Sequence, residues 1–210
     1  MIDFILVHAP VLWSWIVLAL GAAKLIRPNL PYRMRTLVWA TLGFMILYAG
    51  ILTCGQYLTW KADSFGAAFL SAPLSGLGVP LIEMFPNVFN TALGYFVYYV
   101  WSRFWLPMLV SVLVAFLFGW FLRGLGRYRE RFFASGETEF GLLAALAVGW
   151  PGFVLFVPAA FVFVVLVSII RGIFFREAYT TLGLPLAAGA ASALAFAPAV
   201  FSALGLTLGV

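Results

Sequence analysis

Carboxylates are the side chains of this sequence whose type and position could support chemistry. The chain of 210 residues contains only seven Asp and Glu residues, and those beside apolar segments include Glu83, Glu137 and Glu139. A carboxylate at the edge of a membrane segment is costly to keep there, so it calls for a function or a partner. Two carboxyl groups that share one proton could activate water and protonate a leaving group, which is the chemistry of an aspartic peptidase.

Glu83 and Glu139 are the two residues that we expect to form such a pair if the protein is an enzyme. The pair would have to lie close enough for the two pKa values to separate. Glutamate carries the acid group of aspartate on a longer arm, which makes precise orientation harder. The competing hypothesis is that both are interfacial charges, each paired with an arginine, and that Glu137 is merely solvated. The arginines available for this pairing are Arg103, Arg127, Arg129 and Arg131.

Other kinds of site find little support in the sequence. Cys54 is the only cysteine and His8 the only histidine. One cysteine excludes an intrachain disulfide and a zinc ribbon, and one histidine excludes haem held between two histidines of the chain. Neither a P-loop nor a dinucleotide-binding fingerprint is present. We therefore expect no cofactor and no bound metal.

The composition indicates a membrane protein. Hydrophobic residues make up 65% of the chain and charged residues 9%, whereas soluble domains have roughly 25% charged residues. The net charge of +5 comes from short loops between apolar runs, a placement that suits contact with anionic lipid headgroups rather than with nucleic acid. The expected partners are thus the lipid bilayer and other membrane proteins or peptides.

Apolar runs recur along the whole chain and predict an all-α, polytopic integral membrane bundle with about seven or eight membrane segments. The expected segments are 4–26, 37–60, 65–82, 88–101, 105–122, 141–153, 154–170 and 182–210, the last being either one helix or a helix with a re-entrant piece. In the final segment Ala187, Ala191 and Ala195 recur every four residues, so we expect this stripe to make close helix contacts.

The distribution of Lys and Arg predicts the orientation of these segments. The loops 24–35, 123–131 and 171–176 carry the most basic residues and are therefore placed in the cytoplasm, with the N-terminus outside. Three crossings between residues 63 and 123 keep this alternation. The same count puts Glu83 on the cytoplasmic side together with Glu139.

Four short motifs occur in an order and spacing that resemble a known family. They are Phe85-Pro86-Asn87, Gly136-Glu137-Thr138-Glu139, the run Gly141 to Leu146 (GLLAAL) and the run Leu182 to Gly189 (LGLPLAAG). From about Phe85 to Gly189 the chain is similar to the membrane core of the type IV prepilin peptidases, the A24 membrane aspartic peptidases. The resemblance implies a prepilin-peptidase-like core over residues 64–210, N-terminal helices in 1–63 without a clear counterpart, and the bacterial inner membrane as location.

The sequence departs from this family where the catalytic aspartates would stand. Glu139 occupies the position of the second aspartate, and Gly141 that of the usual lysine. The first aspartate would fall on Val79, and the nearest carboxylate to it is Glu83. The resemblance therefore implies the fold more strongly than the activity, and the chain is degenerate at both aspartate positions.

Three functions follow as hypotheses. The first is a catalytically degenerate relative that serves as a membrane subunit or assembly factor of a pilus, secretion or other membrane complex. The second is an active acid peptidase that cleaves leader peptides at the cytoplasmic face with a Glu83/Glu139 pair. The third is a transporter or channel component, which the scarcity of charges inside the apolar segments disfavours.

Overall fold

The structure of the chain, a computed structural model, describes residues 2–74, 83–128, 133–134, 136–175 and 181–205. Throughout these residues the regular secondary structure is helical, and they contain no strand. The expectation of an all-α protein is thus confirmed. The chain forms two compact units, the first made of residues 1–42 and 111–210 and the second of residues 43–110.

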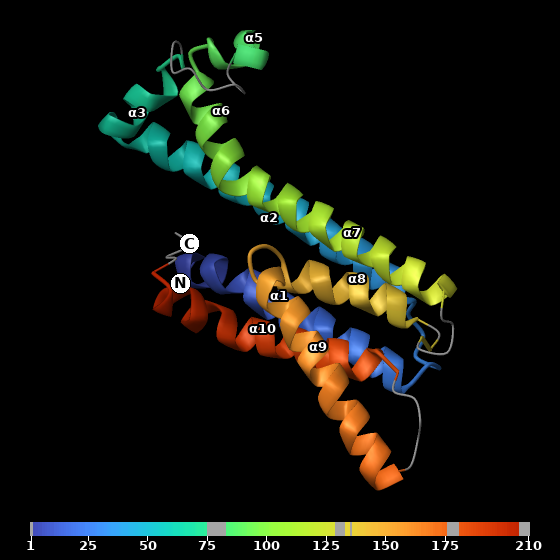
Figure 1. Cartoon of the computed structure of the whole chain (residues 1–210). Helices are drawn as coiled ribbons and strands as arrows, with labels where there is room; N and C mark the ends of the chain where they lie inside the picture. The colour runs from blue at the N-terminus through green and yellow to red at the C-terminus, as the bar shows by residue number, and fades with distance from the viewer. Residues whose placement is uncertain (1, 75–82, 129–132, 135, 176–180, 206–210) are drawn as a thin grey trace. The chain divides into compact units, whose positions relative to one another are not determined.

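Two long helices pass from one unit into the other, and the remaining helices belong to one unit each. The shared helices are α2 (Met34–Ala62) and α7 (Leu106–Tyr128). The first unit also contains α1 (Ile2–Ile26), α8 (Glu137–Val148), α9 (Phe153–Ile170), the π-helical turn η3 (Arg171–Phe175) and α10 (Gly183–Ala203) (Figure 1). The second unit also contains α3 (Ser64–Leu70), α5 (Pro86–Phe89), α6 (Gly94–Val100) and the π-helical turn η1 (Trp101–Trp105).

Five helical segments in the described part of the chain are long and apolar enough to cross a membrane. At 1.5 Å per residue, even the shortest of them approaches the ~30 Å of a bilayer's hydrocarbon core. The protein is therefore a multi-pass helical membrane protein, and the described residues do not confirm the seven or eight segments expected. The five are His8–Ile26, Met34–Ala62, Gly94–Tyr128, Phe153–Phe174 and Gly183–Ala203.

Two of the expected segments merge into one. The sequence predicts separate segments at 88–101 and 105–122, with a short link at Arg103 between them. In the structure a single helical span runs from Gly94 to Tyr128, and Arg103 lies exposed within the π-helical turn η1. A π-helical turn adds a residue to a helix without ending it, so a charge at this position does not require a break.

Two further expected segments are shorter than a full span. In the predicted segment 65–82, helix α3 has 7 residues and ends at Leu70, and residues 75–82 lie outside the described part. In the predicted segment 141–153, helix α8 has 12 residues. Such a helix is roughly 18 Å long, too short to cross a bilayer alone.

Helix α8 lies at the centre of the first unit, with nine of its twelve residues buried. It packs antiparallel to α1. The Ser14 hydroxyl donates a hydrogen bond of 2.6 Å to the Ala147 carbonyl near the end of α8. Near the start of α8, Phe140 and Leu143 approach Gly21, where an added Cβ would lie 2.9 Å from both side chains. Gly21 thus lets the two helices come close together.

Helices α7 and α8 run antiparallel, as do α9 and α10, whereas α8 and α10 run parallel with Glu137 beside Gly183. Helix α7 passes α8 with Gly119 against Leu142. Helix α10 passes α9 so closely that a Cβ at Gly189 would lie 2.7 Å from the Ala160 nitrogen. As a result, the ends of α1, α7 and α9 and the starts of α8 and α10 share one end of the unit (Figure 1). We call it the basic end, because it carries Lys24, Arg27, Arg33, Arg35, Arg123, Arg127 and Arg171.

The turn between α8 and α9 closes a hairpin that leaves from the basic end and returns to it. Gly149 has a φ of 63°, a left-handed conformation that glycine adopts without steric cost. The Trp150 amide donates a hydrogen bond of 2.8 Å to the Ser111 hydroxyl of α7. Non-helical backbone at membrane depth is tolerated where protein covers it and supplies partners. The short helix α8 is therefore stable inside the bundle although it cannot span a bilayer alone.

The packed face of α10 differs from the predicted alanine stripe. Ala187 and Ala191 are half-buried and Ala195 is exposed. The buried residues follow a neighbouring stripe, which comprises Gly183, Pro185, Leu186, Gly189, Ala190 and Ala193. The predicted stripe was wrong because residues 187–195 contain several small side chains, so a four-residue spacing fits more than one face of the helix.

The second unit is held together by aromatic packing around Trp60. Its indole lies 5.0 Å from the Tyr99 ring and 5.6 Å from the Phe96 ring, measured between ring centroids. The Asp63 carboxylate accepts a hydrogen bond of 2.9 Å from the Gly66 amide and so caps the start of α3. The ring contacts join α2 to α6, and the cap fixes the start of α3 directly after the end of α2.

Gly189 provides a test of the α9–α10 contact. Gly189→Leu should lower the free energy of unfolding by about 2 kcal/mol or more, because the side chain would collide with the backbone of Ala160. Ala195→Leu, on an exposed face of the same helix, should change it by less than about 0.5 kcal/mol. Thermal unfolding of both variants in detergent measures the difference. Equal losses of stability would show that the buried face of α10 is assigned incorrectly.

Candidate functional site: the acidic start of helix α8

Two of the candidate carboxylates lie in the first turn of α8. Gly136 precedes the helix with a φ of 89°, and Glu137 and Glu139 follow it. Negative side chains are favoured at the start of a helix because the unpaired amide groups there carry partial positive charge. The local sequence thus explains why both glutamates are tolerated beside an apolar helix, but their surroundings differ.

Glu137 is buried, with 4% of its surface exposed. Its Oε1 accepts a hydrogen bond of 2.8 Å from the Gly183 amide. Its Oε2 accepts bonds of 3.2 Å from the Leu182 amide and 2.9 Å from the Ala134 amide. The expectation that Glu137 is merely solvated is wrong: three backbone amides surround its carboxylate.

These bonds make Glu137 the cap of another helix. The first amides of any helix lack hydrogen-bond acceptors within that helix. Leu182, the residue before α10, has an apolar side chain that cannot accept a hydrogen bond from them. The Glu137 carboxylate, at the start of α8, is the acceptor for these amides. A Cβ at residue 183 would lie 2.7 Å from Glu137 Oε1, so the close approach of the carboxylate requires the glycine found there.

Sequence reasoning missed this pair because Glu137 and Gly183 are 46 residues apart. Neither residue carries a local signal of the contact. The one available hint was that α10 begins without a Ser, Thr, Asp or Asn at its cap position, which leaves its first amides in need of an acceptor from elsewhere.

Glu139 is partly exposed and forms an ion pair. Its Oε1 lies 3.7 Å from Nε of Arg35, and 35% of the glutamate side chain and 76% of the arginine side chain are exposed. The distance is too long for a hydrogen bond, and exposed ion pairs contribute at most about 1 kcal/mol. An arginine partner was expected, but Arg35 was not among the four proposed. Of those, Arg129 and Arg131 lie outside the described residues.

Glu83 belongs to the second unit, where its side chain is exposed. It stands shortly before α5, whose first turn contains Pro86 and Asn87. The expected Pro-Asn turn is therefore the start of a short helix. Glu83 and Glu139 lie in different units, and Val79 lies outside the described residues. A catalytic Glu83/Glu139 pair stays a prediction.

Gly141, where the resembling family has a lysine, is part of the packed core. An added Cβ there would overlap the Leu122 side chain and lie 3.3 Å from Leu186 Cδ1. A lysine at this position would have to displace both leucines. This part of α8 serves to pack helices α7 and α10 together.

The cap can be tested by comparing the two glutamates of α8. Glu137→Gln should lower the free energy of unfolding by about 2–4 kcal/mol, because one acceptor oxygen becomes an amide group that faces a backbone N–H. Glu139→Gln should cost at most about 1 kcal/mol, since its ion pair is exposed. Chemical or thermal unfolding in detergent measures both. A larger loss in Glu139→Gln than in Glu137→Gln would contradict the assignment of the cap.

Comparison with known proteins adds no relative on which to rest an assignment. No protein-family model matches the chain, and neither a curated protein nor a solved structure does. The resemblance to the prepilin peptidases thus stays a prediction carried by the four motifs, and any function has to be argued from the residues described above.

Proposed function

We propose that this chain is a catalytically silent, prepilin-peptidase-like protein of the bacterial inner membrane, and that it acts as a membrane subunit or assembly factor of a larger complex. The observation that carries the proposal is that Glu137 is buried and that three backbone amides donate hydrogen bonds to its carboxylate. The acidic start of α8, where the resembling family has its catalytic motif, uses its buried carboxylate to cap α10. Its function in this protein is to hold helices together.

The geometry of Glu137 and Glu139 supports a structural role for these residues rather than a catalytic one. An aspartic peptidase needs two carboxyl groups that share a proton and contact a water molecule. Both oxygens of Glu137 already accept amide hydrogen bonds. Glu139 retains partial exposure, but the charged group that the structure places beside it is Arg35 rather than a second carboxylate in contact with its oxygens.

The number of spans supports the same conclusion. If the basic end faces the cytoplasm, α1 and α2 place residues 61–63 outside. Among the described residues that follow, one continuous span, Gly94–Tyr128, returns the chain to the cytoplasm, where three crossings were expected. Counted over the described residues, Glu83 precedes that span, so we expect it outside, away from the cytoplasmic face proposed for Glu139. The active-peptidase hypothesis needs both carboxylates on one face.

A cleavage assay tests whether the protein is silent. The wild type, Glu139→Gln and Glu139→Asp would be reconstituted in liposomes with a prepilin that carries a basic leader peptide. We expect no cleavage by any of the three, because both aspartates of the resembling family are replaced and both oxygens of the neighbouring Glu137 are held by backbone amides. A known active prepilin peptidase serves as the positive control. Robust cleavage by the wild type that is lost in Glu139→Gln would refute the proposal and establish the peptidase.

Native gel electrophoresis of solubilised membranes tests the second part of the proposal. A subunit or assembly factor should migrate in a defined assembly larger than its own 23.1 kDa chain in a detergent micelle. Migration as a monomer under mild detergent conditions would argue against a role as a stable subunit.

Cysteine labelling tests the revised orientation. Single cysteines placed at 29, 130 and 174, in a chain whose Cys54 has been replaced, should react with a membrane-impermeant maleimide from the cytoplasmic side only. Cysteines at 3, 62 and 84 should react from outside, because one span separates residue 84 from residue 130. If cysteines at 84 and 130 reacted from the same side, Glu83 and Glu139 would lie on one membrane face, and a catalytic Glu83/Glu139 pair would again be supported.

A further inference from the structure

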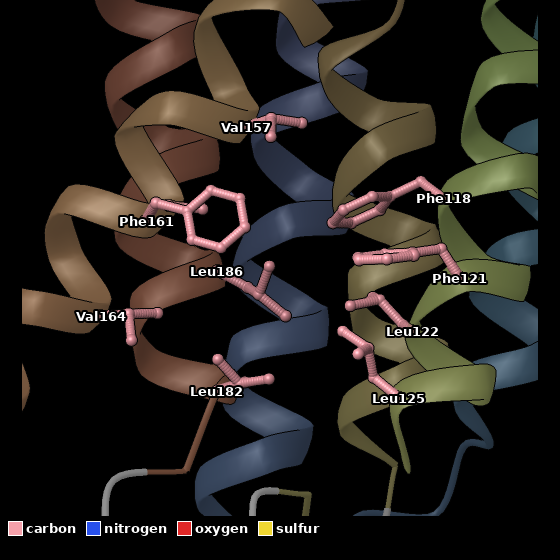
Figure 2. A pocket seen from close by; sticks show the side chains of 10 residues that line it. Phe118, Phe121, Leu122, Leu125, Val157, Phe161, Val164, Leu182 and Leu186 are labelled. Atoms are coloured by element: carbon pink, nitrogen blue, oxygen red, sulfur yellow. The ribbon is translucent and has the colours of Figure 1, made fainter. Parts of the chain in front are cut away.

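An apolar hollow lies on the first unit between α7 and α9. Figure 2 shows Phe118, Phe121 and Leu125 reaching into it from α7, and Phe161 and Val164 from α9. Leu186 of α10 lies between the two helices. The hollow encloses about 50 Å³, and about 390 Å³ when its open mouth is included.

The hollow has a buried floor and an exposed rim. Leu122 and Leu186 are each 3% exposed, whereas Phe121 at the α7 rim is 49% exposed and Phe161 at the α9 rim 61%. All its lining residues are apolar. An apolar hollow of this kind offers water no hydrogen-bond partners and stays dry. Since its walls belong to membrane-spanning helices, the mouth opens toward the hydrocarbon of the bilayer.

The size of the hollow limits what can enter it. A partner helix has a diameter of about 10–12 Å with its side chains, which a hollow of this volume does not admit. One extended hydrocarbon chain is much thinner and can place several methylene groups against the floor. The occupant that fits is an acyl chain.

The charge at one end of the hollow indicates which lipid carries that chain. Leu125 and Leu182 line the hollow near the basic end. Arg171, the first residue after α9, follows Val157 and Val164 by fourteen and seven residues, spacings that return to nearly the same side of a helix. A lipid whose chain lies in the hollow therefore has its phosphate near the Arg171 side of the basic end, where a negative headgroup is favoured.

We propose that the hollow between α7 and α9 binds one acyl chain of an anionic phospholipid whose headgroup lies at Arg171. The site joins three helices of the unit, because its lining comes from α7, α9 and α10. It is independent of the proposed function, since it involves neither Glu137 nor Glu139.

Native mass spectrometry of the detergent-purified protein tests the site. Dioleoyl phosphatidylglycerol would be added to the wild type and to two variants of adjacent residues on α9. Val164→Trp fills the hollow and should weaken phosphatidylglycerol binding about tenfold, the factor expected when about two methylene groups lose their burial. Val165→Trp is the matched control: Val165 is 57% exposed and lies outside the hollow, so its substitution should leave binding unchanged.

Two further measurements distinguish binding of the acyl chain in the hollow from binding of the headgroup at Arg171. Leu125→Trp fills the hollow from the α7 side and should reproduce the effect of Val164→Trp, which guards against a folding defect in one variant. Arg171→Gln should reduce the preference for phosphatidylglycerol over dioleoyl phosphatidylcholine, whereas Arg103→Gln in the second unit should not.

Three results would overturn the proposal. Equal lipid binding by Val164→Trp and Val165→Trp would show that the acyl chain of the lipid does not enter the hollow. Equal binding of phosphatidylglycerol and phosphatidylcholine by the wild type would exclude the anionic headgroup site. A cross-link between cysteines at residue 161 of two copies would show that the mouth is covered by a second copy of the chain.

Discussion

The carboxylate of Glu137 is the constraint on which the first unit depends. A charged group that is 4% exposed is tolerable only when hydrogen bonds replace the water it has lost. The amides of Ala134, Leu182 and Gly183 provide those bonds. Because they belong to the approach to α8 and the start of α10, the carboxylate fixes both helix starts at the same depth. Helix α10 in turn packs against α1, α8 and α9.

The position of α8 explains why the surrounding helices contain glycine where they do. A short helix buried on nearly all sides can be accommodated only if its neighbours approach closely. Gly21 of α1 and Gly119 of α7 leave room for Phe140 and Leu142 of α8, respectively. Within α8 itself, Gly141 leaves room for Leu122. Small residues have the same effect in membrane helices generally, where close packing rather than water exclusion drives association.

The sequence predicted those features that depend on local composition. The segments expected at 4–26 and 37–60 correspond to α1 and α2, and the segment at 154–170 corresponds to α9. Each is a continuous apolar run bounded by charged, proline or glycine residues. The interruption expected at Arg103 was wrong because a single charge does not end a helix whose backbone bonds continue around it. Composition reveals where a chain is apolar, but not whether two apolar runs form one helix.

The candidate site was less predictable, because its geometry depends on contacts between distant residues. The position of Glu139 at the edge of a helix could be inferred, but its pairing with Arg35, about a hundred residues earlier, could not. The hydrogen bond from the Gly183 amide to the Glu137 carboxylate also joins residues that are far apart in the sequence. In both cases the partner is brought close by the antiparallel arrangement of the bundle, which no local pattern encodes.

The length of the span Gly94–Tyr128 has a consequence for the bilayer. Its 35 residues extend roughly 50 Å, whereas the hydrocarbon core is about 30 Å thick. Such hydrophobic mismatch is relieved by tilting or by projection into the headgroup layer. The projecting part would be the α6 end, where Tyr95 and Tyr99 pack around Trp60. Tyrosine and tryptophan are enriched at that depth because their polar groups meet water there, so this aromatic cluster would set how far the helix rises out of the membrane.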